Sequence, residues 1–283
     1  MLTIRETPRV PPEPTRGRRD FFAFPGKDRI RVSAVIITHN ESRNIGRTLS
    51  RLYWCDEIVV VDSYSTDNTV DICREFNCRV YFRDFDGYGA QKRYAAGLAK
   101  NDWILSLDAD EVLSEMLIRE IIQEFKKGPA FSGYRLPMNL VFLGREFRHG
   151  KESQRYFLRL FRKTRGKFNE ATVHEQIELP GHTGKMKHAL QHFSYANIGD
   201  WHAKMERYTT MGAEGAVKKG KNKSFFALVV ALPYYFLRYY LLEGNFLNGQ
   251  EGFYWAVLSA HYHFTKYVKI REIHARTTRP AIS

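Results

Sequence analysis

Two aspartates, Asp108 and Asp110, stand two positions apart in the segment LSLDADE, at the end of a mostly apolar run. Residues two apart in a strand project to the same side, so the two carboxylates are expected to converge. Such oxygens suit a hard divalent cation, Mg²⁺ or Mn²⁺, which takes its other ligands from water and from substrate phosphates. The pair indicates either a metal-assisted phosphate site or an acidic turn in which Asp110 caps the following helix.

Two other polar clusters also follow apolar, β-branched runs. THNE (38–41) comes after VSAVII, and DSYSTD (62–67) comes after EIVVV. Runs of this kind are typical of strands that are buried on both faces. Ligands of open α/β sheets bind at the carboxyl ends of the strands. We therefore expect all three clusters to line one edge of a sheet.

Segments with helical spacing alternate with these runs. Strands are predicted at 32–38, 57–63, 78–85 and 102–111, and helices at 40–55, 65–76, 89–100 and 116–127. This alternation predicts an α/β fold, with a parallel sheet and helices on both faces. Later strands are predicted at 133–143, 155–163 and 174–179, followed by a helical, aromatic-rich last third.

VIITHNE, EIVVVDSYSTDNT, a helix bearing QK, and WILSLDADE resemble, in order and spacing, the family 2 glycosyltransferases of the GT-A fold, a Rossmann-like nucleotide-diphospho-sugar transferase fold. The resemblance covers residues 32 to about 180. It implies a nucleotide-sugar donor, UDP-linked, and Mg²⁺ or Mn²⁺. By position it implies that Lys92 contacts the diphosphate and Asp110 the metal. The contacts to the base and ribose are implied for Thr38, Asn40, Glu41, Asp62 and Asp108. Asp67 is expected to order its turn instead.

An inverting transferase also needs a carboxylate that deprotonates the acceptor hydroxyl. The segment VHEQ resembles that of bacterial lipopolysaccharide core β-1,4-glucosyltransferases, which implies Glu175 as the base and His174 as a metal ligand or acceptor contact. Glu170 and Glu152 are alternative bases. Neighbouring residues of a strand face opposite ways, so His174 and Glu175 cannot both point inward without a bulge. The basic run just before this segment either meets phosphates or faces solvent: Arg155, Arg159, Arg162, Lys163 and Arg165.

The formal net charge of +13 is unevenly distributed along the 283 residues. Residues 1–31 carry +4, residues 32–127 carry −4, and residues 128–283 carry +13. A nucleic-acid-binding protein would more often have its positive charge on the domain with the binding motif, so we expect no nucleic-acid partner. The basic half is expected to meet phosphates and an anionic membrane surface.

The C-terminal third begins with a lysine cluster ahead of an apolar, aromatic stretch: Lys218, Lys219, Lys221 and Lys223, then Phe225 to Leu237. The stretch has 13 residues, whereas crossing a bilayer takes about 20. The first 20 residues contain no apolar leader. We expect a cytoplasmic protein on the inner face of the cytoplasmic membrane. It would have a disordered arm (1–31), a catalytic domain (32–200) and interfacial helices (201–283), which alternatively pack as a buried hairpin.

These observations predict an inverting glycosyltransferase that moves a sugar, with glucose as a candidate, from a UDP-linked donor to a lipid-linked saccharide such as lipopolysaccharide core. The alternatives are a polyprenyl-phosphate or peptide acceptor, and an inactive GT-A scaffold. Polyprenyl-phosphate enzymes that end in long transmembrane helices differ from this sequence, which disfavours that acceptor. The sequence predicts no oligomeric state.

Overall fold

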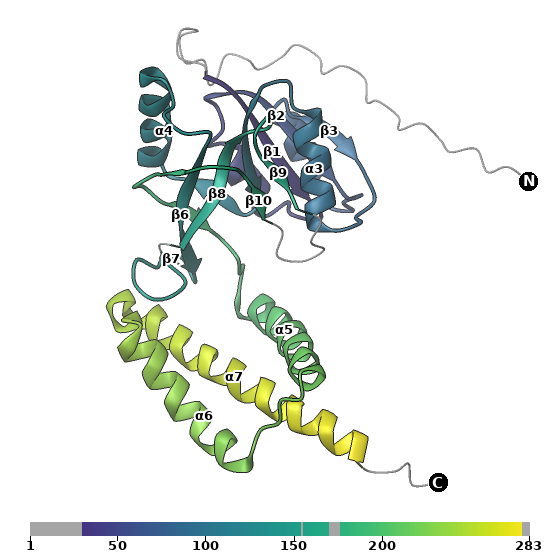
Figure 1. Cartoon of the computed structure of the whole chain (residues 1–283), viewed down its shortest axis with the longest axis vertical. Coiled ribbons are helices and arrows are strands. Elements are labelled where there is room, and N and C mark those ends of the chain that lie inside the picture. The colour runs from purple at the N-terminus through teal and green to yellow at the C-terminus, as the bar shows by residue number, and fades with distance from the viewer. Residues whose placement is uncertain (1–29, 154, 170–175, 279–283) are drawn as a thin grey trace, which may run out of the picture. The chain divides into compact units, whose positions relative to one another are not determined.

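The computed structural model of the protein describes residues 30–153, 155–169 and 176–278 (Figure 1). The chain divides into two compact units. Unit 1 comprises Met1–Met138 and Tyr156–His192, and unit 2 comprises Asn139–Arg155 and Phe193–Ser283. The sequence alone predicted a helical region beginning at residue 201. Unit 2 begins eight residues earlier, at Phe193, and also takes in a segment from the middle of the chain.

The centre of unit 1 is a parallel arrangement of four strands, in the order β3-β2-β1-β4. These strands are β1 (Ile30–Thr38), β2 (Cys55–Asp62), β3 (Arg79–Phe82) and β4 (Trp103–Asp108). The sheet continues from β4 through four strands, β8 (Arg155–Arg162), β6 (Gly133–Phe142), β12 (Leu190–His192) and β5 (Glu111–Leu113). Strand β8 runs antiparallel to β4. The predicted parallel sheet is therefore confirmed, and a mixed part that includes the antiparallel pairs β4–β8 and β12–β5 extends it.

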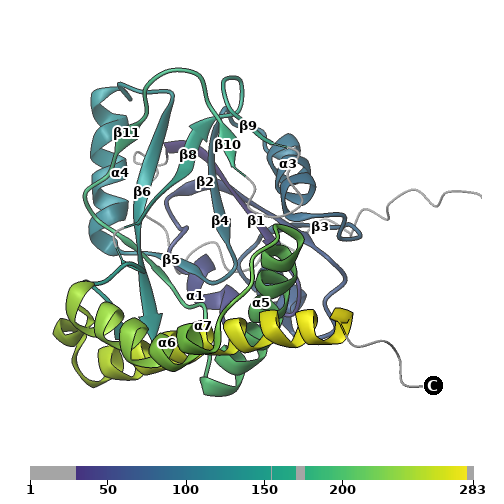
Figure 2. The same cartoon turned by 60° about the horizontal axis from the view of Figure 1, so that its bottom comes forward.

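Helices cover both faces of this sheet, because both faces of β1 are apolar. Ala34 and Ile36 pack in a cluster with α1 (Ile45–Leu49) and α4 (Glu115–Lys127), whereas Val35 and Ile37 pack in a second cluster with α3 (Tyr88–Leu98). Figure 2 shows α3 and α4 on opposite sides of the strands. The helices of unit 1 are α1 (Ile45–Leu49), α2 (Thr69–Glu75), α3 (Tyr88–Leu98) and α4 (Glu115–Lys127).

Four short strands complete the described sheets: β7 (Arg145–Glu146), β9 (Lys167–Phe168), β10 (Ile177–Glu178) and β11 (Gly184–Lys185). Strands β9 and β10 pair antiparallel. Several predicted elements are shorter than expected. The helix predicted at 40–55 is reduced to the five residues of α1, the helix predicted at 65–76 to α2, and the strand predicted at 78–85 to β3. Of the strand predicted at 174–179, the structure describes residues 176–179, and β10 takes up Ile177–Glu178.

Unit 2 is mainly helical. Its elements are α5 (Ile198–Lys218), α6 (Phe225–Leu237), the π-helical turn η1 (Arg238–Leu242), the 3₁₀ turn η2 (Asn245–Asn248) and α7 (Gly249–Thr278). Helices α6 and α7 pack along each other (Figure 1). Leu140, Phe142 and Phe147 from the β6–β7 hairpin form one core with Trp201, Met205 and Trp255 from the helices. This shared core explains why the hairpin groups with the helices.

The apolar helix of unit 2 is longer than the stretch counted in the sequence. Pro233 lies inside α6, and η1 continues the helix to Leu242. The resulting 18-residue segment, Phe225–Leu242, has a mean hydropathy of 1.6, and 11% of it is buried within the protein. By length and composition alone, this segment suffices to cross a membrane.

Candidate functional site

The carboxyl ends of β1, β2 and β4 bring the three polar clusters together. Thr38 pairs in register with Asp62, and Ile37 pairs with Asp108. All three clusters therefore leave the sheet at the same edge, as their positions after apolar runs predicted. This edge lies entirely within unit 1.

The first two clusters are locked together by their own polar groups. The backbone N–H of Asn40 donates to Ser65 Oγ (2.8 Å), and Asn40 Oδ1 accepts from the Thr66 N–H (2.8 Å). Asn40 has φ = 55°, in the left-handed region that asparagine tolerates better than most residues. The fully buried Asp62 accepts from both the backbone N–H and the hydroxyl of Ser65 (2.8 and 2.5 Å). These contacts give the loops a fixed shape before any ligand arrives.

Glu41 and Asp67 fasten the same loops to the start of α2. The Glu41 N–H donates to Thr69 Oγ1 (2.8 Å), and Asp67 accepts from Ser42 and from Thr69. Desolvation would raise the pKa of Asp67, but the hydrogen bonds from Thr69 and Ser42 outweigh it and lower the pKa to about 2. Asp67 therefore orders the turn, as expected. Thr38 Oγ1 is buried and has no hydrogen-bond partner among the described residues, which leaves it able to bond a ligand.

Asp108 sits between two cations. Its Oδ1 lies 2.7 Å from Lys92 Nζ, and its Oδ2 lies 3.2 Å from Arg159 Nη2. Burial would raise the pKa of Asp108, but the positive charges of Lys92 and Arg159 outweigh it and hold the pKa well below its usual range. Lys92 is almost fully buried on α3. In the structure Lys92 thus neutralises Asp108, and its contact with a diphosphate stays a prediction.

Glu111 completes this network, and the sequence did not single it out. The fully buried Glu111 accepts from Arg159 Nη2 (2.5 Å) and from the backbone N–H of Asp108 (3.1 Å). Burial, together with the nearby charge of Asp108, raises the pKa of Glu111 despite the attraction of Arg159. Arg159 therefore joins two carboxylates at the end of β4.

Asp110 points to a residue from a distant strand. Its Oδ2 lies 3.3 Å from Nε2 of His192, and His192 pairs in register with Glu111 across β12 and β5. Burial would lower the pKa of His192, but its hydrogen bond to the Asp110 carboxylate and the charges of Glu111 and Asp108 outweigh it, so the pKa is raised. The sequence did not predict a role for His192, because only its pairing with β5 places it near Asp110. The first residue of β5, Glu111, was predicted to belong to the strand at 102–111.

A cation at this edge would find few protein ligands. Among the residues that the structure describes, no group of three or more His, Cys, Asp or Glu side chains lies close enough to hold a metal ion. The Asp110–His192 pair offers one carboxylate oxygen and one imidazole nitrogen. The carboxylate suits either Mg²⁺ or Mn²⁺, whereas the imidazole suits Mn²⁺ better, because Mg²⁺ prefers oxygen ligands. Either ion would take its remaining ligands from water and substrate phosphates.

The predicted base and its histidine, Glu175 and His174, lie outside the described residues, as does the alternative base Glu170. The residues on either side of 170–175 are fastened to each other. Asn169 and Gln176 exchange two hydrogen bonds (2.9 and 3.1 Å), and Arg93 of α3 donates to the Asn169 carbonyl (2.5 Å). Both ends of the segment are thereby tied to α3, the helix that carries Lys92.

The other alternative base and the basic run are mostly occupied by local contacts. Glu152, in unit 2, lies 3.3 Å from Arg155. Arg162 pairs with Asp102 (3.4 Å), and Lys163 donates to the Ala99 carbonyl (2.5 Å). Arg165, Lys163 and Lys167 line a surface cavity of about 560 Å³ on the β8–β9 turn. Of the run, Arg159 is the member that contacts Asp108.

The residues that form this sheet edge lie within a match to a known protein family, "Glycosyl transferase family 2". The match covers residues 33–184, more than half of the chain. The chain belongs to glycosyltransferase family 2. The matched region includes the three polar clusters, the 170–175 segment and Arg159. The protein is therefore a glycosyltransferase, and its α/β domain has the GT-A fold, with a helical C-terminal region.

Curated family 2 relatives extend over most of the chain. The "Lipopolysaccharide core biosynthesis glycosyltransferase LpsC" of Rhizobium meliloti is 32% identical over 259 residues, which cover 89% of this chain and 96% of the relative. An uncharacterized glycosyltransferase of Rickettsia conorii is 29% identical over 254 residues, covering 86% of this chain and 90% of that one. The likeness to both relatives thus extends beyond the GT-A domain into the helical region.

Two solved structures show a more distant likeness. Residues 1–349 of Staphylococcus aureus TarS are 14% identical with a TM-score of 0.42, covering 88% of this chain and 92% of that one. Glucosyl-3-phosphoglycerate synthase from Mycobacterium tuberculosis, solved with Mn²⁺, UDP and glucosyl-3-phosphoglycerate, is 18% identical with a TM-score of 0.34. It covers 39% of this chain and 44% of that one.

Proposed function

We propose that this family 2 enzyme transfers a sugar, with glucose as the first candidate, from a UDP-linked donor to a lipid-linked saccharide of the lipopolysaccharide-core type. The observation that carries the proposal is the convergence of Asp62, Asp108 and Asp110 at one carboxyl edge of the family's sheet. The relative named for lipopolysaccharide core biosynthesis, which matches 89% of the chain, supports the acceptor class.

The donor would lie across the interlocked loops at this edge. Asp62 would accept a hydrogen bond from the base or ribose, and Thr38, Asn40 and Glu41 would surround the nucleoside. The unpartnered, buried Thr38 hydroxyl supports a polar ligand there. Asp108 would face the ribose, while Lys92 and Arg159 offset its charge and add positive potential for the diphosphate.

We infer that Asp110 and His192 would hold Mg²⁺ or Mn²⁺, with His174 as a further candidate ligand. When bound, such an ion stabilises the negative charge of a departing nucleoside diphosphate. His192 Nε2 would have to be deprotonated to bind the ion, and the elements that position it are strands β5 and β12.

The transfer itself would be a single displacement with inversion. The acceptor hydroxyl oxygen forms a bond to the anomeric carbon, the bond from that carbon to the β-phosphate oxygen breaks, and the hydroxyl proton passes to a carboxylate. Glu175 is our candidate for that carboxylate, with Glu170 and Glu152 as alternatives. The fastening of residues 169 and 176 to α3 supports a base from this segment.

The acceptor would be reached at an anionic membrane surface on the cytoplasmic side. Unit 2 exposes large apolar side chains along α6 and the turns after it, with Phe226 at 75% and Leu242 at 82% exposure. Large exposed apolar patches mark interaction sites, and the preceding lysines would add attraction to anionic lipids. We infer an interfacial placement because polar side chains of α7 lie alongside this segment: Tyr267 contacts Tyr235 of α6, and His263 contacts Tyr239 of η1.

A donor panel tests the catalytic part of the proposal. The purified protein is incubated with UDP-, GDP- and ADP-sugars and Mn²⁺, and nucleotide release and the shift in melting temperature are measured. We expect a UDP-sugar to give both signals, because a bound ligand stabilises the folded state in proportion to its occupancy. Release from none of the donors would favour the inactive-scaffold alternative. Transfer to polyprenyl phosphate or to a peptide in place of a saccharide would correct the acceptor.

Vesicle flotation tests the membrane part. The full chain is mixed with vesicles of neutral lipid alone or with anionic lipid added. We expect stronger binding to the anionic vesicles, weakened by Phe226→Glu and unchanged by the matched substitution Met116→Glu on exposed α4 of unit 1. Equal binding by both variants, or no preference for anionic lipid, would contradict the interfacial placement.

A further inference from the structure

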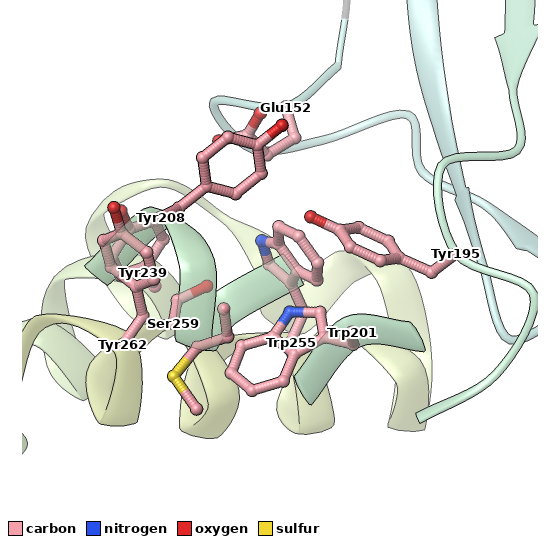
Figure 3. Close-up of a pocket in the computed structure, with 9 residues that line it drawn as sticks. Glu152, Tyr195, Trp201, Tyr208, Tyr239, Trp255, Ser259 and Tyr262 are labelled. Carbon is pink, nitrogen blue, oxygen red and sulfur yellow. The ribbon is translucent and has the colours of Figure 1, made fainter. Parts of the chain in front are cut away.

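Unit 2 contains a cavity of about 190 Å³ that is lined mostly by aromatic side chains (Figure 3). The rings are those of Tyr195, Trp201, Tyr208, Tyr239, Trp255 and Tyr262. Glu152 and Ser259 add a carboxylate and a hydroxyl. All of these residues belong to unit 2, whereas the donor-site residues that the structure describes belong to unit 1.

We propose that this cavity binds one sugar ring of the saccharide acceptor. The proposal rests on the function proposed above, because it assigns a binding site to that enzyme's acceptor. A pyranose ring has an apolar C–H face and a rim of hydroxyl groups. Tyrosine and tryptophan match both features, since each presents a flat apolar face and a polar hydrogen-bonding tip.

The polar groups of the lining are suited to hydroxyl partners. Trp255 is 93% buried, and its Nε1–H has no hydrogen-bond partner among the described residues. Buried polar groups nearly always have such a partner, so this N–H is suited to a ligand oxygen. Burial raises the pKa of Tyr195 to about 12, so its hydroxyl keeps its proton at neutral pH and can donate, whereas the Tyr239 hydroxyl already lies 3.1 Å from His263 Nε2. Glu152 supplies an acceptor.

A cationic ligand fits this cavity less well, although aromatic cages often bind quaternary ammonium groups. Three of the rings already interact with cations of the protein: Lys204 lies 5.2 Å from the Tyr195 ring centre, Arg207 lies 5.1 Å from that of Tyr208, and Lys266 lies 5.9 Å from that of Tyr262. The carboxylate of Glu152 is also paired with Arg155. A second cation would therefore be repelled by charges that already use these rings and this carboxylate.

A hydrocarbon chain fits less well for the opposite reason. It would cover the Tyr hydroxyls, Ser259 and Glu152 without replacing their hydrogen bonds to water, which is costly. The size of the cavity points the same way. Sites for drug-sized ligands measure about 300 to 1,000 Å³, so a cavity of about 190 Å³ suits a single ring at one position of a longer saccharide.

The wall that carries Glu152 is held in place by the helices. Asn248 accepts from the N–H groups of Arg148 and His149 (3.1 and 3.3 Å) and donates to the His149 carbonyl (2.9 Å). Gly150 has φ = 94°, and a Cβ there would lie 2.5 Å from the Asn245 side chain. The loop thus fits closely against η2. A preformed wall lowers the ordering cost of binding.

Calorimetry with lipid-free core oligosaccharide released from lipopolysaccharide, in the absence of nucleotide, tests the proposal. We expect the wild type to bind, and Tyr208→Ala to bind about tenfold more weakly, equivalent to about 1.4 kcal/mol. Tyr208 is 45% exposed, so the fold should tolerate its loss. Tyr254→Ala is the matched control, because Tyr254 is 44% exposed on α7 and does not line the cavity. Choline chloride and octanoate serve as probes of the two rejected ligand classes.

Unchanged affinity in Tyr208→Ala, no binding by the wild type, or displacement of the saccharide by choline or octanoate would overturn the proposal. Asp110→Ala separates it from the proposed function. Saccharide binding that persists in Asp110→Ala and responds to Tyr208→Ala, with no transfer by the wild type, would leave the cavity assignment and refute the function. Transfer by Tyr208→Ala with an unchanged acceptor KM would support the function and refute the cavity assignment.

Discussion

Arg159→Met is the most informative single change in the sheet edge. The guanidinium of Arg159, whose side chain is 12% exposed, joins Asp108 to the fully buried Glu111. Asp108 keeps Lys92 in the variant, because Lys92 contacts the other carboxylate oxygen. Glu111 loses its ion-pair partner and keeps the Asp108 N–H and the electrostatic attraction of His192 and Lys92. The variant therefore leaves one fully buried carboxylate without a direct ion pair.

The size of the effect follows from that carboxylate. Removing one partner of a buried ion pair costs about 3 to 5 kcal/mol. Glu111 limits the cost by binding a proton, since its pKa is already raised by burial. We therefore expect a loss of about 3 kcal/mol at pH 7. A raised pKa means that the folded state binds the proton more tightly than the unfolded state does. The deficit should therefore shrink as the pH is lowered from 7 to 5.

Urea unfolding followed by far-UV circular dichroism measures this cost at both pH values. Glu111→Gln keeps an acceptor for the Asp108 N–H without the charge, so the double variant Arg159→Met/Glu111→Gln should recover most of the lost stability. A loss below about 1 kcal/mol for Arg159→Met, or a double variant that is less stable than both single variants, would refute the reasoning.

Two further predictions concern histidines. Burial, with the nearby positive charges of Lys266, Arg238 and Lys151, lowers the pKa of His263 to about 4. As the pH drops, His263 therefore binds a proton in the unfolded chain before it does so in the folded protein. The stability of the wild type should fall as the pH drops from about 6.5 to about 4. Chemical denaturation should show this fall to be smaller in His263→Gln, and an identical fall would contradict it. His192→Ala should raise the Mn²⁺ concentration for half-maximal nucleotide release by about tenfold or more, and an unchanged metal titration would exclude His192 as a ligand.

Much of the fold was predictable because both faces of the first strands are buried. Continuous β-branched runs such as VSAVIIT and EIVVV specify such strands with little ambiguity, and helical spacing between them requires parallel crossovers. The short strands β5, β7, β9, β11 and β12 were not predicted as separate strands. Two or three residues carry no periodicity, and their pairing depends on partners far away in the sequence.

The candidate site was predictable in part for a similar reason. Asp62, Asp108 and Asp110 follow strands, so the sheet alone brings them to one edge. Glu111 and His192 escaped notice because a buried carboxylate and a histidine on a three-residue strand have no local signature. Their significance comes from Arg159 and Asp110, which approach them only in the folded chain. Likewise, the sequence predicted a diphosphate contact for Lys92 but not its ion pair with Asp108, because the two residues meet only in the folded chain.

Sugar transfer to lipid tests the central claim most directly. The purified full chain is incubated with radiolabelled UDP-glucose, Mn²⁺ and lipid-linked saccharide acceptor, and label is counted in the lipid fraction and in the aqueous phase. We predict label in the lipid fraction that depends on Mn²⁺ and is lost in Asp110→Ala. Label that stays in the aqueous phase, both with UDP-glucose and in parallel incubations with radiolabelled GDP- and ADP-glucose, would contradict the claim, as would transfer that is undiminished in Asp110→Ala.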